Sequence, residues 1–113
     1  MIYEAAVLAH ADLNDEKLAD VKAIITSVIH DHKGEIYLSD DWGVRTFAQP
    51  TDRHIKRGRY IYFLYTANNL ANAEIDRRLR INDGVIRSMI IKADEYKTKD
   101  DLIKNYKSPF ANN

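Results

Sequence analysis

The sequence predicts an α+β fold of the ferredoxin-like βαββαβ type, in which a four-stranded antiparallel sheet carries two helices on one face. Two observations predict it. Four short segments have the composition and alternation of strands, and two others repeat apolar residues at helical spacing. Their order is that of two split crossover units joined by a hairpin. The 113 residues suffice for one domain with its own core.

The first third of the chain predicts a strand followed by a helix. The segment Ile2–His10 is short, and one of its faces is apolar, which indicates a strand. Asn14 can cap the next segment, Asp15–His32, whose apolar residues form one helical stripe. Acidic residues begin this helix and Lys33-Gly34 closes it, as the helix dipole and the C-terminal glycine rule favour.

Three further strands are predicted. Glu35–Phe47 is a long strand in which Gly43 indicates a bulge or a close backbone approach. Arg59–Ala67 is rich in tyrosine and aliphatic residues, which are favoured in sheets. Val85–Ala93 follows a turn signal and is the last strand.

The second helix lies between the last two strands, where Asn68 or Asn69 can cap it, and it runs to about Arg80. Right-handed crossovers then place the first and third strands in the centre of the sheet. The opposite face of the sheet, or its edges, would be available for a partner. We therefore expect a ferredoxin-like domain over residues 1–93 and a C-terminal tail, with weak periodicity, over residues 94–113.

The charges balance in number but not in position. Seventeen Lys and Arg against seventeen Asp and Glu give a net charge of zero, which at first argues against nucleic acid. However, residues 1–41 carry nine acids and three bases, residues 42–93 four acids and ten bases, and residues 94–113 four of each. The basic part contains Arg53, His54, Lys56, Arg57 and Arg59 near the hairpin loop, and Arg77, Arg78, Arg80, Arg87 and Lys92 beyond it. Such clusters beside tyrosines suit RNA, and they equally suit a solvated helix face with a charged loop.

Several kinds of chemistry have no support in the sequence. The chain has no cysteine, and His30 and His32 are two residues apart, so they point to different sides of a helix and cannot share a metal. Asp40 and Asp41 would face opposite ways on a strand, and Asp41 is expected to accept hydrogen bonds at a turn or bulge. We therefore expect no enzyme, no metal, no cofactor and no small-molecule substrate. No apolar run is long enough for a membrane helix, and the N-terminus lacks the basic start of a secretory signal, so a cytoplasmic protein is expected.

Two segments resemble the signatures of one known family. The first is Asp41-Trp42-Gly43-Val44-Arg45 followed by Phe47-Ala48-Gln49-Pro50, and the second is Arg80-Ile81-Asn82-Asp83-Gly84-Val85-Ile86-Arg87-Ser88-Met89. Both resemble the bacterial small ribosomal subunit protein six (S-six) family, and the resemblance extends over residues 1 to about 93. Gln49 and Thr51 depart from the family pattern, which commonly has an aromatic and an aliphatic residue there.

The resemblance implies a structural protein of the small ribosomal subunit. Such a protein would bind the central domain of the small-subunit rRNA together with small-subunit protein eighteen. Its neutral net charge predicts weak RNA binding without that partner. The rRNA phosphate contacts are expected among Arg45, Lys56, Arg57, Arg59, Arg80, Arg87 and Lys92.

Two aromatic residues are candidate contacts with the protein partner. By the resemblance, Phe110 near the C-terminus is an anchor in a groove of the partner, and the alternative is a frayed terminus. Trp42 is a candidate interface anchor, and the alternative is that it fills the core between strand and helix.

A second function remains possible from the fold alone. The chain could be a ferredoxin-like regulatory or small-ligand-binding module that is oligomeric through its sheets, because this fold hosts many functions. Charge discriminates the two hypotheses, since a ligand-binding module has no need of the basic segment at residues 42–93.

Overall fold

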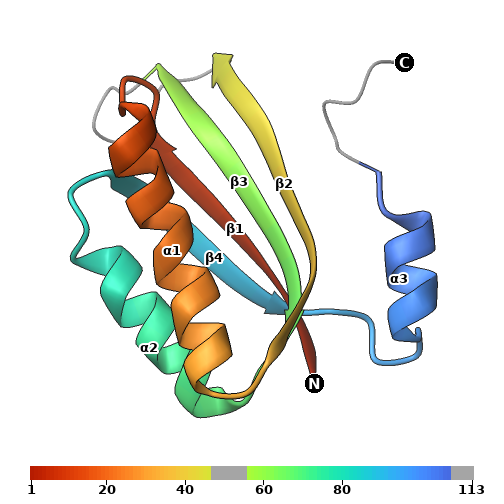
Figure 1. The fold of residues 1–113 in the computed structure, drawn as a ribbon. Helices are drawn as coiled ribbons and strands as arrows, with labels where there is room; N and C mark the ends of the chain where they lie inside the picture. The colour runs from red at the N-terminus through yellow and green to blue at the C-terminus, as the bar shows by residue number, and fades with distance from the viewer. Residues whose placement is uncertain (47–55, 108–113) are drawn as a thin grey trace.

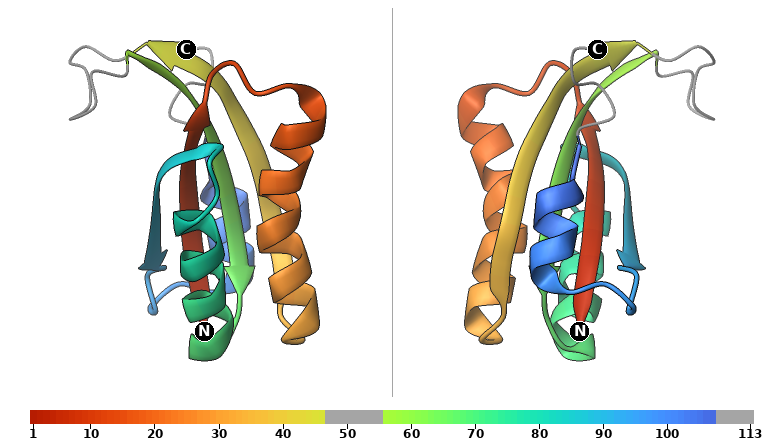
Figure 2. Two further views of the ribbon diagram at one scale, coloured as in Figure 1. Left: turned by 90° about the vertical axis from the view of Figure 1, so that its left-hand side faces the viewer. Right: turned by 90° about the vertical axis from the view of Figure 1, so that its right-hand side faces the viewer.

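The computed structural model describes residues 1–46 and 56–107. Its strands form one antiparallel sheet in the order β2-β3-β1-β4. Helices α1 and α2 cover one face of this sheet, and α3 lies against the other face (Figures 1 and 2). The elements are β1 (Ile2–His10), α1 (Asp15–Asp31), β2 (Glu35–Thr46), β3 (Arg57–Thr66), α2 (Asn69–Arg80), β4 (Val85–Lys92) and α3 (Lys99–Asn105). The predicted ferredoxin-like fold, with β1 and β3 central, is confirmed.

The pairing of β1 with both neighbours assigns side chains to the two faces. Ala5 of β1 is opposite Phe63 of β3 and Ile90 of β4, and this row faces the helices. The next row contains Ala6, Tyr62 and Met89 and faces the other way. We call this second side the open face of the sheet.

The main core lies between the sheet and helices α1 and α2. The predicted stripe of α1 is buried, because its apolar side chains recur at the helical period and all reach the sheet. Burying each such aliphatic side chain stabilises the fold by about 1.5–3 kcal/mol. The largest fully buried side chains of this layer are Val7, Val21, Ile25, Val28, Ile29, Ile61, Phe63, Tyr65, Ile75 and Leu79.

The end of α1 differs from the prediction in one backbone detail. Lys33, and not the glycine after it, adopts the left-handed conformation, with φ 61°. The N–H of Gly34 donates to the carbonyl of Ile29 at 2.8 Å, and the N–H of Lys33 donates to the carbonyl of His30 at 3.0 Å, which together form a Schellman motif. Glycine is required at position 34 for space, because a Cβ there would lie 2.3 Å from the carbonyl oxygen of Thr66.

Element boundaries differ from the prediction by one or two residues. Helix α1 ends at Asp31, with His32 as its C-cap. Strand β3 begins at Arg57 instead of Arg59, because its ladder with β2 continues to the pair Thr46 and Arg57. Strands β3 and β4 each end one residue earlier than predicted.

The Schellman motif yields a paired stability prediction. Lys33→Gly should stabilise the protein by up to about 1 kcal/mol, because it removes the cost of a side chain in the left-handed region. Gly34→Ala should destabilise it by about 1–3 kcal/mol, because the new methyl group collides with a backbone oxygen. Chemical denaturation of the two variants measures both effects, and equal effects of the two substitutions would contradict this account of the turn.

Candidate functional site

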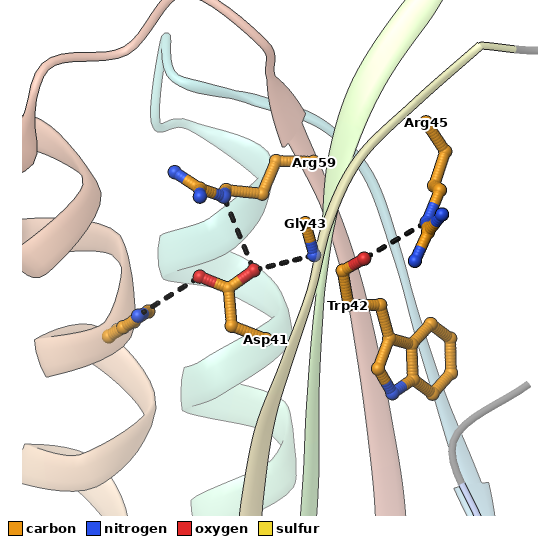
Figure 3. A network of polar contacts seen from close by, with 6 residues as sticks. Asp41, Trp42, Gly43, Arg45 and Arg59 are labelled. Carbon is orange, nitrogen blue, oxygen red and sulfur yellow. Dashed lines mark hydrogen bonds and ion pairs between the residues drawn. The ribbon is translucent and has the colours of Figure 1, made fainter. Parts of the chain in front are cut away.

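The segment Asp41–Arg45 forms a β-bulge in β2 (Figure 3). Between Asp41 and Gly43 the register with β3 shifts by one residue, and Gly43 has φ 76°. The Asp41 carboxylate accepts a hydrogen bond from the N–H of Gly43 at 2.8 Å, which confirms the predicted role of this side chain. Glycine suits the positive φ, and the neighbouring acid caps the N–H that the bulge takes out of the ladder.

The bulge changes which side chains share a face of β2. A strand alternates its side chains, so one extra residue reverses the alternation beyond it. Trp42 and Arg45 therefore lie on the same side of β2, opposite Asp41 (Figure 3). The Nε of Arg45 donates to the carbonyl of Trp42 at 3.0 Å, and this hydrogen bond holds the guanidinium group beside the bulge.

On the side of the helices, Asp41 pairs with two cations. Its carboxylate lies 3.5 Å from Lys22 Nζ of α1 and 3.2 Å from Arg59 Nε of β3. These contacts tie α1, β2 and β3 together at one point. They also offset part of the charge of Arg59, one of the residues predicted to bind RNA.

Six of the seven predicted RNA-binding cations lie at one end of the sheet. At this end β2 finishes, β3 and β4 begin and α2 finishes, because antiparallel strands bring these chain ends together (Figure 1). The seventh residue, Lys92, is the last of β4 at the opposite end, where its Nζ lies 3.2 Å from Glu95. Arg53 and His54 of the predicted cluster lie outside the described residues. We call the six the basic end: Arg45, Lys56, Arg57, Arg59, Arg80 and Arg87.

A polar hollow of about 590 Å³ lies within the basic end. Its charged lining is Arg80 and Arg87 together with Asp76 and Asp83, and His10 and Ser88 also border it. Arg80 Nη2 is 2.8 Å from the carboxylate of Asp76, which also lines the hollow, so part of its charge is compensated.

The other two arginines of α2 are compensated within the helix. Arg77 and Arg78 lie 2.7 and 3.2 Å from Glu74. The hydrogen bond from Arg77 lowers the pKa of Glu74, so this carboxylate remains ionised beside them. For Arg77 and Arg78, the structure therefore favours the alternative of a solvated helix face over an RNA-binding cluster.

The open face carries a stack of three aromatic side chains. The rings of Trp42 and Tyr62 are stacked with centroids 5.5 Å apart, and those of Tyr62 and Tyr106 are 4.9 Å apart. Trp42 Nε1 donates to the Tyr106 hydroxyl at 2.7 Å, and that hydroxyl donates to the Asp40 carboxylate at 2.7 Å. Trp42 therefore lies outside the main core under α1 and α2 and packs, half-buried, in a smaller cluster between the sheet and α3, and its role as an interface anchor stays a prediction.

Helix α3, which holds Tyr106 over the sheet, was not predicted. It packs Leu102 and Ile103 against the open face. Its N-terminus has a capping box, in which Thr98 caps the N–H of Asp101 and the Asp101 carboxylate accepts from the N–H of Thr98. The Thr98-x-x-Asp101 spacing, with Leu102 and Tyr106 one turn apart, was the available sequence signal.

A second polar contact lies beside the stack. The Tyr62 hydroxyl donates to the Glu4 carboxylate at 2.6 Å. Burial, and then the hydrogen bond to Glu4, raise the pKa of Tyr62 well above its usual value of 10.0. The pair is therefore formed by a neutral tyrosine and a carboxylate.

Phe110 lies outside the described residues, so its predicted role has no structural description. Among the described residues, no group of three or more His, Asp or Glu side chains is placed to hold a metal ion. None of the helices in this part of the chain is long and apolar enough to cross a membrane.

The chain is similar to known ribosomal proteins in sequence and in fold. Residues 2–92 match the family model described as Ribosomal protein S6. The chain is 37% identical over 93 residues to small ribosomal subunit protein bS6 of Geobacter metallireducens, covering 82% of this chain and 78% of that protein. It is 33% identical over 109 residues to bS6 of Bdellovibrio bacteriovorus, covering 96% and 71%. The crystal structure of 30S ribosomal protein S6 from Thermotoga maritima matches with a TM-score of 0.70 and 20% identity, over 80% of this chain and 84% of that chain.

Removing one oxygen atom should loosen α3. In Tyr106→Phe the ring stack remains, but the hydroxyl that joins Trp42 to Asp40 is lost, at a cost of about 1 kcal/mol. Amide hydrogen exchange of residues 99–105 should become faster while exchange in β1 and β3 stays unchanged. Trp42, the only tryptophan, supplies a fluorescence signal for the same change. Unchanged exchange in α3 would show that the hydroxyl does not hold the helix.

The raised pKa of Tyr62 predicts an alkaline loss of stability. The folded protein holds this proton more tightly than the unfolded chain, so the stabilisation is complete below about pH 10 and falls as the pH rises toward the folded pKa. Between the unfolded and the folded pKa, the free energy of unfolding should fall by about 1.4 kcal/mol per pH unit for each tyrosine whose pKa is raised by folding. Urea unfolding at pH 8 and pH 11 measures it, and Tyr62→Phe should show the smaller decline.

Proposed function

The chain belongs to the ribosomal protein S6 family of the small ribosomal subunit, and on that premise we propose that it binds the central domain of small-subunit rRNA jointly with small-subunit protein eighteen. The family is one of structural ribosomal proteins and not of enzymes. In this proposal the protein acts in the cytoplasm, on the ribosome, by holding RNA and a neighbouring protein in place.

The observation that carries the RNA part of the proposal is the convergence at the basic end. Segments separated by 35 positions in the sequence, at Arg45 and Arg80, supply cations to one end of the molecule. Lys and Arg side chains bind phosphates and release counterions, whatever the base sequence. Arg45 of β2 and Arg87 of β4 belong to the two edge strands, so the two span the sheet by roughly 14 Å, three strand spacings.

The charge balance supports the need for a basic partner. Asp41 pairs with Arg59 and Asp76 pairs with Arg80, so part of the positive charge of the basic end is compensated. With a net charge of zero over the whole chain, long-range attraction to RNA is weak. A basic partner would supply the long-range attraction to the RNA. The cations of the basic end would then fix the position of the RNA on this protein.

The rRNA contacts can be tested against a control at the other end of the molecule. Arg87→Ala and Arg45→Ala should each weaken binding of a central-domain rRNA fragment to the two-protein complex and lower the slope of log K against log salt by about 0.7–0.9 per lost contact. Lys92→Ala is the matched control, because it removes a cation outside the basic end. Gel shifts at several salt concentrations measure both quantities.

Two results would count against the proposal. Strong binding of the RNA fragment by this chain alone would remove the need for protein eighteen. Unchanged assembly into the small subunit after charge reversal of both Arg80 and Arg87 would show that the basic end is not the RNA-binding surface.

A further inference from the structure

The polar hollow of the basic end lies between the end of α2 and the start of β4. Asp76 and Arg80 line it from the helix, Asp83 lines it from the turn, and Arg87 lines it from the strand. Its volume of about 590 Å³ is in the range of pockets that hold a small organic molecule. Because its charged lining is balanced in sign, it is a poor match for a phosphate, which offers acceptors only. It suits a polar group that offers donors and acceptors together.

Two of the four charged groups are available to a ligand. Arg80 and Asp76 pair with each other at 2.8 Å. Asp83 and Arg87 are both exposed, and neither has an ion-pair partner among the residues that the structure describes. A carboxylate accepts two hydrogen bonds side by side, and a guanidinium group donates two in the same way. The hollow therefore presents one pair of acceptors and one pair of donors.

The turn that carries Asp83 is fixed by hydrogen bonds of its neighbours. The N–H of Gly84 donates to the side-chain oxygen of Asn82 at 2.7 Å, and the N–H of Val85 donates to the carbonyl of Asn82 at 3.1 Å. The carbonyl of Gly84 accepts from the N–H of His10 at 2.9 Å, which joins the turn to β1. A turn held in this way presents its carboxylate to a ligand without first having to be ordered.

The first residues of β4 contain a second β-bulge. Val85 is opposite Ala9, and Arg87 is opposite Leu8. Ile86 is therefore the extra residue between the two pairs. Bulges change the direction of side chains and are common beside binding sites. This bulge belongs to the hollow, because Val85, Ile86 and Arg87 all line it.

Guanine is the base that matches one pair of donors and one pair of acceptors. Its O6 and N7 atoms are the acceptor pair that arginine binds in a bidentate contact. Its N1–H and N2–H₂ groups are a donor pair, which a carboxylate can accept. On the same edge, each of the other three bases places at least one acceptor toward the carboxylate, and that contact is repulsive. Base pairing occupies this edge, so the guanine has to be unpaired, as are most bases that proteins recognise in RNA.

We propose that the polar hollow holds one unpaired guanine of the rRNA, with Arg87 on its O6 and N7 atoms and Asp83 on its N1–H and N2–H₂ groups. Asp83 is then a specificity-determining residue within the basic end. The inference rests on the proposed function, because it names the nucleotide that the basic end takes up.

The direction of one effect tests the proposal. Asp83→Asn removes a negative charge beside the RNA, so charge alone predicts tighter binding of a central-domain rRNA fragment to the two-protein complex. Recognition of guanine predicts the opposite, a loss of affinity of about tenfold, because the amide places its own N–H₂ group against one of the two donors. Gel shifts measure the affinity, and circular dichroism verifies that the variant is folded.

Asp12→Asn is the matched control. Asp12 is an exposed carboxylate in the turn after β1, at the same end of the molecule, and it does not line the hollow. Its replacement removes the same charge and should leave the affinity unchanged or raise it slightly.

A base analogue identifies the nucleotide. Inosine lacks the N2 amino group of guanine and keeps its O6 and N7 atoms. When inosine is incorporated at random into the rRNA fragment, it should interfere with binding of the unaltered protein at one unpaired guanine. The same position should show no interference with Asp83→Asn, because the variant no longer depends on that amino group.

The outcomes separate this inference from the proposed function. If the unaltered chain and protein eighteen together do not bind the fragment, both fall. If they bind and Asp83→Asn binds equally well or more tightly, the function stands and the hollow does not recognise a base. An affinity loss with no inosine position that depends on Asp83 overturns the inference as well. If Asp83→Asn weakens the binding of protein eighteen in the absence of RNA, the hollow is a protein contact and the inference is overturned.

Discussion

The bulge at Trp42 and Gly43 sets the alternation of β2, and both candidate surfaces depend on it. Without the extra residue, Arg45 would face α1 instead of sharing a side with Trp42. Asp41 holds the bulge closed through the N–H of Gly43 and connects it to α1 and β3 through two cations. One carboxylate thus places an arginine of the basic end and the tryptophan to which the C-terminal helix attaches.

The fold was predictable because the helices and strands of each layer have a recognisable pattern of apolar residues in the sequence. Polar and apolar residues separate cleanly along α1, and the tyrosine-rich third strand has no helical alternative. Right-handed crossovers then fixed the strand order without further information. The bulge was also predictable, because a glycine inside a strand segment commonly marks a bulge or a close backbone approach.

Other features depended on contacts between distant parts of the chain. The register of β2 with β3 sets the side on which Trp42 lies, its contact with Tyr106 joins residues 64 positions apart, and α3 is too short to show periodicity. The positive φ of Lys33 escaped prediction because Gly34 follows it, and the close approach of Thr66 that requires this glycine exists only in the folded protein. The cations could be counted from the sequence, but the separation of Lys92 from the other six required the strand directions.

The long edge strand β2 has a consequence for the protein before it is assembled. An exposed edge offers unpaired N–H and C=O groups to the strands of other chains, which is a route to aggregation. In β2 the bulge twists this edge, Asp41 occupies the N–H of Gly43, and charged residues stand on both sides of it. The bulge that places Arg45 on the open face therefore also makes β2 a less regular template for the strand of another molecule.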